Sequence, residues 1–428
     1  MEISRTETPR PGHAGEELSF LCVLPEDDWH IYTRRHHLGA LAEHGPLLAV
    51  ERPLGLKRSL LADRSGRRLR PAGAGHAHGA WLIQPSSLRL PIAGARGRSV
   101  RGQIQRALRT LGMERPVAVL TSPAQRWFFD LDIETSGVCF ELSDEFSLYT
   151  QYPFIRSTEM YDKIVDMVRR SDVVFATARS LAEEFAAVRG NTYWVPNTAE
   201  PEDFCVTPHT AVLPELRDLS RPVIGFIGGL NPWIDVELLL GIQELRPDWS
   251  IVFSASLDGP PAFLESEPVR RFQRENRIVR FLGWVPYPRL RNFLRGVDVC
   301  ALFHRVSEVT RFIHPNKIYQ YLASGKPIVS TPFLPEIEEF GSSIRLATTP
   351  KEFVEAVERG LEEGPHEGQE RVRIASERSP VRRASRKVAI IRDRVLGPGA
   401  GNRARSGAQA GSIDAAKPDP SASRTVSD

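Results

Sequence analysis

Short apolar runs alternate with helix-like stretches along the first half of the chain. Apolar runs that predict buried strands lie at Leu18–Leu24, Leu47–Val50, Pro116–Leu120, Val138–Glu141, Asp172–Ala176 and Thr192–Val195. Stretches with the apolar spacing of helices lie at Tyr32–Glu43, Glu159–Arg170 and Ser180–Val188. This alternation is typical of βαβ units around a parallel sheet.

A second series of the same kind follows segment 205–220, whose prolines and scarce apolar pairs predict a linker. Its predicted strands are Pro222–Ile227, Trp249–Ala255, Ile278–Leu282, Val297–Phe303 and Pro327–Ser330. Its predicted helices are Ile234–Leu245, Pro288–Leu294, Asn316–Ala323 and Lys351–Glu362. The pattern predicts two α/β domains, 18–204 and 221–378, with a ligand cleft at the carboxyl ends of both sheets.

Composition supports a globular protein, with 428 residues, 41% hydrophobic and 25% charged. The ends, 1–17 and 397–428, have few large apolar groups and are expected to be disordered tails. No apolar run is long enough to cross a bilayer, and the first residues lack the apolar core of a signal peptide, so a cytoplasmic location is expected. Single cysteines in apolar runs (Cys22, Cys139 and Cys300) predict buried thiols and neither a disulfide framework nor a metal site.

Charge is distributed unevenly along the chain. The stretch from Arg52 to Arg115 holds 14 Lys and Arg against two acidic residues, Asp63 and Glu114, although the net charge of the whole chain is only +3. Such a segment can face a phosphorylated substrate, anionic lipid or nucleic acid, or simply form a solvated surface. It lacks the interleaved aromatic residues of a base-stacking surface, so no nucleic-acid partner is expected.

The sequence HPNKIYQYLASGKPIVSTPFLPEI, residues 314–337, contains the sharpest chemical signal. Asn316 and Lys317 fall in the first turn of a predicted helix, where free N–H groups and the helix dipole favour a phosphate. The Lys317 ammonium adds a mobile cation suited to a diphosphate. An ordinary helix that begins with a lysine is the alternative.

The order Pro-x-Lys, Tyr-Leu-Ala and Gly-Lys-Pro-Ile-Val-Ser-Thr-Pro in this segment resembles the donor half of a known family. It is similar to retaining glycosyltransferases of the family-four type (group 1), and most of all to their exopolysaccharide and teichuronic-acid branch. The resemblance covers roughly residues 18–396 and is stronger in the C-terminal half. It implies the GT-B fold, in which two Rossmann-like domains face each other across a cleft. It also implies that 379–396 is a helix crossing back to the N-terminal domain.

The resemblance further implies a donor site in the C-terminal domain. Gly228 and Gly229 would allow a pyrophosphate close to the backbone, and the backbone from Val285 to Tyr287 would meet the base, although Tyr287 fits a plain surface aromatic equally well. The residues expected to bind the donor are Gly228, Gly229, Asn231, Trp233, Asp235, Val285, Tyr287, Arg311, Pro315, Asn316, Lys317 and Gln320.

Acceptor and catalytic residues follow from the same resemblance. Those expected on the acceptor side are Trp29, Arg34, Arg35, Asp144 and Glu145, with Glu141 as a further acidic candidate. The candidate catalytic residues are His314, His30 and Glu308. Many relatives carry two glutamates eight positions apart, where this chain has Phe312 and Gln320. The Gln320 amide can still hydrogen-bond a ribose, whereas Phe312 cannot replace a carboxylate.

The function that the resemblance implies is transfer of a hexose from a nucleoside-diphosphate sugar to an acceptor hydroxyl, with retention and without a metal. The co-substrate is the nucleotide sugar, and no other cofactor is expected. The expected acceptor is a surface glycan, an exopolysaccharide or a lipid-linked sugar, with peripheral contact to an anionic membrane at the inner face of the plasma membrane. A nucleotide-sugar epimerase and a non-catalytic nucleotide-binding GT-B protein are the alternatives.

Overall fold

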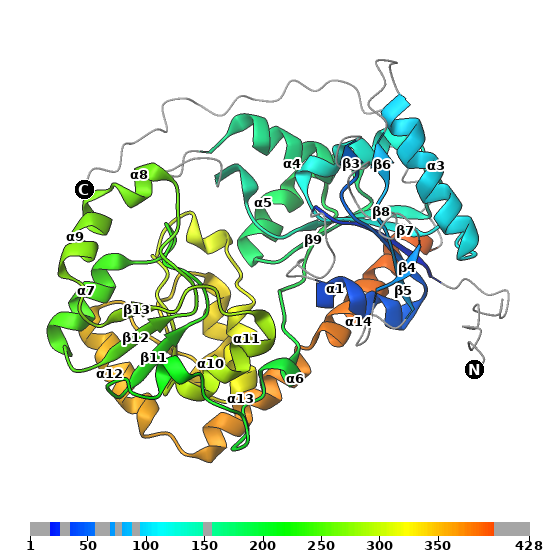
Figure 1. Ribbon diagram of the computed structural model, residues 1–428. Helices are drawn as coiled ribbons and strands as arrows, with labels where there is room; N and C mark the ends of the chain where they lie inside the picture. Colours follow the sequence, from blue (N-terminus) through cyan, green and yellow to red (C-terminus); the bar gives the residue numbers. More distant parts are fainter. Residues whose placement is uncertain are drawn as a thin grey trace.

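The computed structural model describes residues 18–25, 35–55, 69–72, 79–87, 95–148 and 156–397. They form two α/β domains, each built on a mainly parallel sheet (Figure 1). The two-domain α/β architecture predicted from the sequence is therefore confirmed.

The N-terminal sheet has the strand order β10-β9-β8-β7-β1-β2-β5-β4. Its strands are β1 (Phe20–Val23), β2 (Leu47–Val50), β4 (Arg70–Pro71), β5 (Ala80–Ile83), β7 (Val117–Leu120), β8 (Gly137–Leu142), β9 (Val173–Ala176) and β10 (Thr192–Trp194). The pairs are parallel except that β4 runs antiparallel to β5. Two short strands, β3 (Leu54–Gly55) and β6 (Ser86–Ser87), pair separately.

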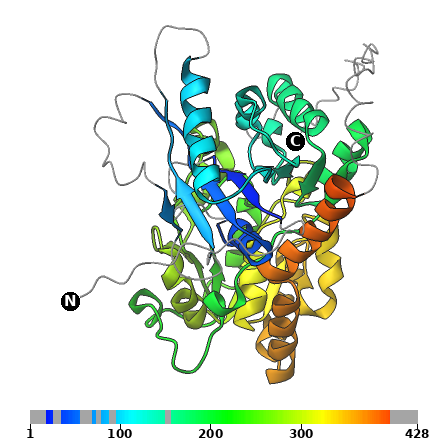
Figure 2. The same ribbon diagram turned by 90° about the vertical axis from the view of Figure 1, so that its right-hand side faces the viewer.

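Helices cover both faces of this sheet because successive strand residues point to opposite sides. Leu21 belongs to the cluster on one face and Cys22 to the cluster on the other. The helical elements of the domain are α1 (Arg35–Gly39), its 3₁₀ continuation Ala40–His44, α3 (Ala95–Thr110), the 3₁₀ helix Pro123–Leu131, α4 (Thr158–Arg170), α5 (Arg179–Arg189) and α6 (Pro201–Phe204). Figure 2 shows α3 standing along the side of the N-terminal sheet.

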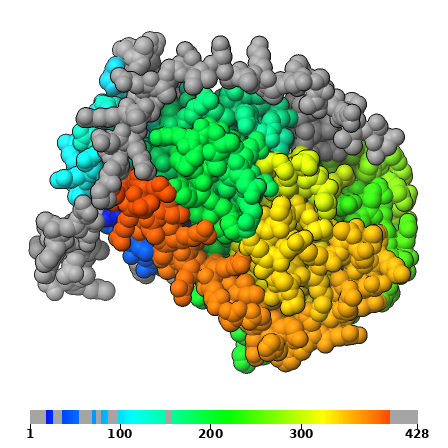
Figure 3. Space-filling view, turned by 180° about the vertical axis from the view of Figure 1, so that it is seen from behind, coloured from blue at the N-terminus to red at the C-terminus, as the bar shows by residue number. Residues whose placement is uncertain are grey.

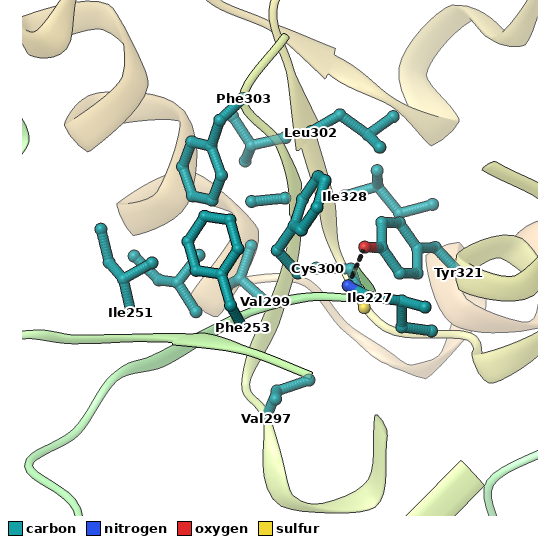
Figure 4. Close-up of a cluster of buried hydrophobic side chains, with 14 of the residues drawn as sticks. Ile227, Ile251, Phe253, Val297, Val299, Cys300, Leu302, Phe303, Tyr321 and Ile328 are labelled. Carbon is teal, nitrogen blue, oxygen red and sulfur yellow. Dashed lines mark hydrogen bonds between the residues drawn. The ribbon is translucent and has the colours of Figure 1, made fainter. Parts of the chain in front are cut away.

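The C-terminal sheet is parallel, with the order β13-β12-β11-β14-β15-β16. Its strands are β11 (Val223–Phe226), β12 (Ser250–Phe253), β13 (Val279–Phe281), β14 (Val299–Leu302), β15 (Ile328–Ser330) and β16 (Arg345–Leu346). Its helices are α7 (Val236–Leu245), α8 (Pro261–Leu264), α9 (Glu267–Glu275), α10 (Leu290–Gly296), α11 (Lys317–Ser324), α12 (Pro350–Leu361) and α13 (Pro365–Glu377). Phe253, Val299 and Phe303 pack in its core beside Tyr321 of α11 (Figure 4).

Some elements differ from the sequence-based expectation. The helices α3, α9 and α13 are not predicted, because each buries only a few residues and is otherwise polar. In α9 the buried residues are Val269 and Phe272, and in α13 they are Arg371 and Ala375. Segment 205–220, predicted as a linker, buries Leu213 and Leu216 in the C-terminal core. The three buried cysteines agree with the sequence-based prediction, and burial raises the pKa of Cys22 to about 12.

The last helix, α14 (Pro380–Ile391), packs on the N-terminal domain, where Val388 and Ile391 join the cluster of β1 and α1. In the space-filling view the chain passes over the back of both domains at this point (Figure 3). A buried ion pair joins the Lys387 ammonium of α14 to the Glu141 carboxylate of β8. Arg383 lies 3.7 Å from the same carboxylate. A sequence-based acceptor candidate, Glu141, thus holds α14 on the sheet.

Replacing Glu141 with alanine is expected to destabilise the protein by about 3–5 kcal/mol, because the Lys387 ammonium stays buried without its carboxylate. Urea unfolding at neutral pH measures the loss. The matched control is Glu159→Ala, which removes an exposed carboxylate paired with Lys163 on α4 and should leave the midpoint unchanged. Equally small effects of both substitutions would contradict the structural role of the buried pair.

Candidate functional site

A loop of bare backbone follows β11 in the C-terminal domain. Gly228 has φ +128°, and its N–H donates to Ser254 Oγ at 2.9 Å. A Cβ added to Gly229 would lie 2.2 Å from the carbonyl oxygen of Ser256, so no side chain fits there. The loop therefore exposes peptide groups rather than side chains at the carboxyl end of the sheet, where open α/β sheets bind ligands.

Helix α11 begins beside this loop. The Ile227 N–H, at the end of β11, donates to the buried hydroxyl of Tyr321 at 2.7 Å (Figure 4). At the other end of the helix Gly325 closes α11 in the left-handed conformation, with φ +71°. These contacts set the first turn of α11 against Gly228, and a Cβ added to Gly228 would lie 3.7 Å from Lys317 Nζ.

Lys317 is a half-buried cation. Its ammonium lies 4.8 Å from the centre of the Phe226 ring. Among the described residues it makes no hydrogen bond or ion pair. Burial lowers the pKa of Lys317 to about 8. An ammonium without a carboxylate, beside backbone N–H groups at a helix start, is suited to bind a phosphate group.

His304 stands next to this cation at the end of β14. Its ring is buried and stacks on Phe333, with 4.1 Å between ring centres, and Nδ1 has no hydrogen-bond partner. Burial, and next the charge of Lys317, lower the pKa of His304 far below its ordinary value. The ring is therefore neutral at physiological pH and can serve as a packing group or as a neutral hydrogen-bonding group.

Three predicted donor residues shape the loop before α7. The Asn231 side chain accepts from the Trp233 N–H at 3.1 Å. Asp235 caps α7 by accepting from the Leu238 N–H, also at 3.1 Å. The Trp233 carbonyl accepts from the Arg305 N–H at 2.8 Å. Local hydrogen bonds thus account for Asn231 and Asp235 without a ligand, and their donor role stays a prediction.

The remaining predicted residues of α11 lie around its start. Pro315 and Asn316 form the turn before the helix, and their carbonyls accept from Ile318 and Tyr319. The Asn316 side-chain oxygen is buried without a hydrogen-bond partner. Gln320 follows Lys317 by three residues and is half-buried, so both lie on one side of the helix. The structure thus brings Lys317 beside Gly228, and Asn316 and Gln320 lie on the same turn as Lys317, where the Gln320 N–H donates to the Asn316 carbonyl at 3.2 Å.

His314, predicted as catalytic, has both ring nitrogens in hydrogen bonds. Nδ1 lies 3.1 Å from Glu336 and Nε2 lies 3.0 Å from the Tyr319 hydroxyl. Glu336 also accepts from the backbone N–H of Arg179, in α5 of the other domain, at 2.9 Å. Burial raises the pKa of Glu336, but its hydrogen bonds, first from His314, outweigh this and hold it below the ordinary value. His314 thus helps join the domains, and its catalytic role stays a prediction.

The loop before α11 also reaches the N-terminal domain. Phe312 is buried in the N-terminal cluster, near α5, and Val309 packs against the same cluster. Glu308 and Arg311 are exposed and pair with each other at 3.2 Å. The position at which the family resemblance places a glutamate therefore forms an apolar contact between the domains. The structure brings neither Glu308 nor Arg311 into a buried site.

Tyr287 lies at the same junction. Its hydroxyl donates to Asp203 at 2.9 Å, and its ring stacks on His36 of α1 with 5.4 Å between ring centres. The neighbouring Val285 is buried, and its N–H donates to the Ser254 carbonyl at 3.0 Å. These contacts place Tyr287 between the domains; its contact with a base stays a prediction.

The structure tests the acceptor-side candidates only in part. Trp29, His30 and Arg34 lie outside the described residues, and so does the side chain of Arg35, which begins α1. Asp144 is half-buried in the turn after β8, where its carbonyl accepts from Phe146. Glu145 is fully buried and accepts from the Ser147 N–H at 3.2 Å, while its other oxygen has no partner.

Burial raises the pKa of Glu145, although the Ser147 hydroxyl and the charge of Arg156 oppose the shift. A buried carboxyl with one unpaired oxygen and a raised pKa can hold a proton, as a general acid or base requires.

The N-terminal domain also contains a pocket that the sequence analysis does not identify. It has a volume of about 790 Å³ and lies where β1, β2 and β7 end, with Arg52, Arg98, Arg101 and Trp127 in its lining. In the sequence these arginines stand out only as part of the local excess of positive charge. The position of Arg52 just after a predicted strand is the signal that indicates a pocket residue.

Among the described residues, no group of His, Cys, Asp or Glu is arranged to hold a metal ion.

Comparisons with known proteins agree with this geometry. Residues 221–363 match the family model of the glycosyl transferases group 1. TuaH of Bacillus subtilis (strain 168), named as a teichuronic acid biosynthesis glycosyltransferase, is 23% identical over 169 residues. That match covers 39% of this chain and 41% of TuaH.

Solved structures share the whole architecture. Sucrose-phosphate synthase from Thermosynechococcus elongatus superposes with a TM-score of 0.61 at 12% identity, covering 89% of this chain and 100% of that chain. HepE from Anabaena, in complex with UDP-glucose, superposes with a TM-score of 0.60 at 14% identity, covering 87% and 99%. The chain thus has the GT-B fold, and residues 221–363 form a domain of the glycosyl transferases group 1 family.

Proposed function

We propose that this chain is a glycosyltransferase that moves a sugar from a nucleoside-diphosphate sugar to an acceptor hydroxyl. The observation that carries the proposal is the unpaired Lys317 ammonium beside the bare backbone of Gly228 and Gly229. The group 1 domain that contains these residues and the name of TuaH support the same reaction. HepE, bound to UDP-glucose, makes a UDP-sugar the first donor to test.

In the proposed reaction the bond from the anomeric carbon to the diphosphate breaks as the acceptor oxygen attacks, and the proton of the acceptor hydroxyl passes to the leaving diphosphate. Negative charge grows on the leaving diphosphate, and the Lys317 ammonium with nearby N–H groups stabilises it. Lys317 supplies the positive charge, so the proposal includes no metal. In this proposal the half-buried Gln320, three residues after Lys317 on α11, hydrogen-bonds the nucleotide, with Asn316 close by. Retention at the anomeric carbon follows from the family resemblance, and proton NMR of the product anomer tests it.

The proposed role is surface glycan or exopolysaccharide synthesis, which the name of TuaH supports. Peripheral contact with an anionic membrane at its inner face is part of the proposal, because α3 exposes Arg106 and Arg109. Among the described residues no helix is both long and apolar enough to span a membrane.

One observation favours a second candidate, a non-catalytic protein that binds nucleotides. Phe312 is buried between the domains where the family resemblance places a glutamate, and Glu308 is exposed and paired with Arg311. Nucleotide binding without any turnover over a broad donor and acceptor panel would support this candidate. Conversion of the donor without an acceptor would instead indicate an epimerase.

Lys317→Met is expected to leave thermal stability unchanged or to raise it at neutral pH. The folded pKa of Lys317, about 8, lies below the unfolded value near 10.4, so the charged form disfavours folding. This cost is complete below about pH 8 and disappears as the pH rises towards the unfolded pKa. Unfolding temperatures measured across this range should therefore converge at high pH. A variant that unfolds at lower temperature than the wild type at neutral pH would contradict a ligand-binding role.

Lys317→Met is also expected to weaken nucleotide binding by roughly 10- to 100-fold, the loss of one charged hydrogen bond. Thermal unfolding with UDP, GDP, ADP and dTDP measures the affinity, since a ligand at 100 times its Kd stabilises by about 2.7 kcal/mol. For the wild type, Kd should rise as the pH increases through about 8, because the ammonium loses its proton.

Lys351→Met is the matched control, because Lys351 is an exposed lysine in the first turn of α12 in the same domain. It should bind nucleotides as the wild type does. If no nucleotide shifts the unfolding temperature of the wild type, or if both variants bind equally well, the proposed donor site is wrong.

A further inference from the structure

The pocket of the N-terminal domain lies at the carboxyl ends of three strands. Leu24 follows β1, Arg52 follows β2 and Ser122 follows β7, while α3 and the 3₁₀ helix Pro123–Leu131 form its walls. Its volume of about 790 Å³ is within the range of small-molecule sites.

The floor of the pocket is held by a buried hydrogen-bond network. The Gln125 amide donates to the Val23 carbonyl at 3.0 Å and accepts from the Thr121 N–H at 2.7 Å. The Thr121 hydroxyl donates to the same carbonyl at 3.0 Å. These bonds tie the end of β1 to the end of β7 beside the pocket lining.

Positive charge dominates the described lining. The described lining contains three arginines (Arg52, Arg98 and Arg101) and one acidic residue, Asp130. The Asp130 carboxylate is exposed and lies 3.9 Å from Arg170. Arg101 pairs at 2.9 Å with an exposed carboxylate outside the lining, while its Nε is buried without a hydrogen-bond partner. Arg98 is exposed and makes no hydrogen bond or ion pair within the described residues. Donors therefore remain available for an anion.

Apolar groups share the lining with these cations. The half-buried Trp127 stands near Leu131 and Val100 in the wall. An indole face packs well on the C–H face of a sugar ring, because both surfaces are flat and apolar. The pocket thus combines a surface for a ring with guanidinium groups for an anion.

We propose that this pocket binds the acceptor through a phosphate ester or diphosphate, with the acceptor sugar against Trp127. The proposal rests on the glycosyltransferase function and adds the chemical class of the acceptor. A phosphate monoester carries a charge of about −1.5 to −2 at neutral pH, and the Arg98 guanidinium in the lining is available to bind it. Guanidinium groups bind phosphate oxygens in pairs. The phosphate belongs either to a soluble sugar phosphate or to a lipid-linked sugar.

The test is titration calorimetry with the full chain saturated with UDP, which occupies the Lys317 site. The probes are glucose, glucose 6-phosphate and a short polyprenyl diphosphate-linked sugar in detergent micelles, with empty micelles as a blank. Phosphate-bearing probes are expected to bind at least 10-fold more tightly than glucose. Arg98→Gln should lose roughly 10- to 100-fold of that affinity, whereas UDP binding stays unchanged.

Arg106→Gln is the matched control, because Arg106 is an exposed arginine of the same helix outside the pocket lining, and it should bind as the wild type does. Tighter binding of glucose 6-phosphate identifies a soluble acceptor, and tighter binding of the micellar probe identifies a lipid-linked one. Equal binding of glucose and both phosphate probes, no binding of any probe, or unchanged affinity in Arg98→Gln overturns the inference. These failures differ from failure of the proposed function, which would appear as absent UDP binding.

Discussion

The first turn of α11 carries an ammonium that the fold leaves without a carboxylate, and the C-terminal site depends on this constraint. Tyr321 anchors the helix to the end of β11, and Gly229 keeps the facing loop free of side chains. Lys317 is consequently held against backbone rather than against an acid. Because burial of an unpaired charge disfavours folding, the arrangement is best explained by an anionic ligand that completes it.

Three buried contacts fix how the C-terminal part of the chain sits against the N-terminal domain. The Lys387–Glu141 pair fastens α14 to the N-terminal sheet, and the His314–Glu336 pair reaches the backbone of Arg179. The third contact is Phe312 in the N-terminal core. The side chains of each contact are buried, so separating the domains would expose them to water. From the sequence, Glu141 is expected on the acceptor side and His314 is expected to be catalytic. In the structure both residues take part in these contacts.

The sequence predicts most strands of the two main sheets because buried parallel strands are continuous apolar runs; β2 coincides with the predicted Leu47–Val50, whereas β4, β5 and β16 are not predicted. The cluster of Gly228 and Lys317 is also predictable, since its motifs lie on adjacent strand ends. The sequence could not predict α3, whose apolar positions Val100, Ile104 and Leu108 lie among arginines. Nor could it predict that Phe312 crosses to the other domain, because such a contact depends on how two separate cores meet.

The proposed chemistry explains why each of the two domains carries a cationic site. A nucleoside diphosphate and a phosphorylated acceptor repel each other, and at 4 Å two unit charges interact by about 4 kcal/mol at an effective dielectric constant of 20. One cationic site cannot offset this repulsion for both substrates. Lys317 lies in one domain, and Arg98 and Arg101 lie in the other, more than 200 residues earlier. The local charge excess from Arg52 to Arg115, hidden in a net charge of +3, contains the three arginines that line the pocket, and these suit a transfer between two anions.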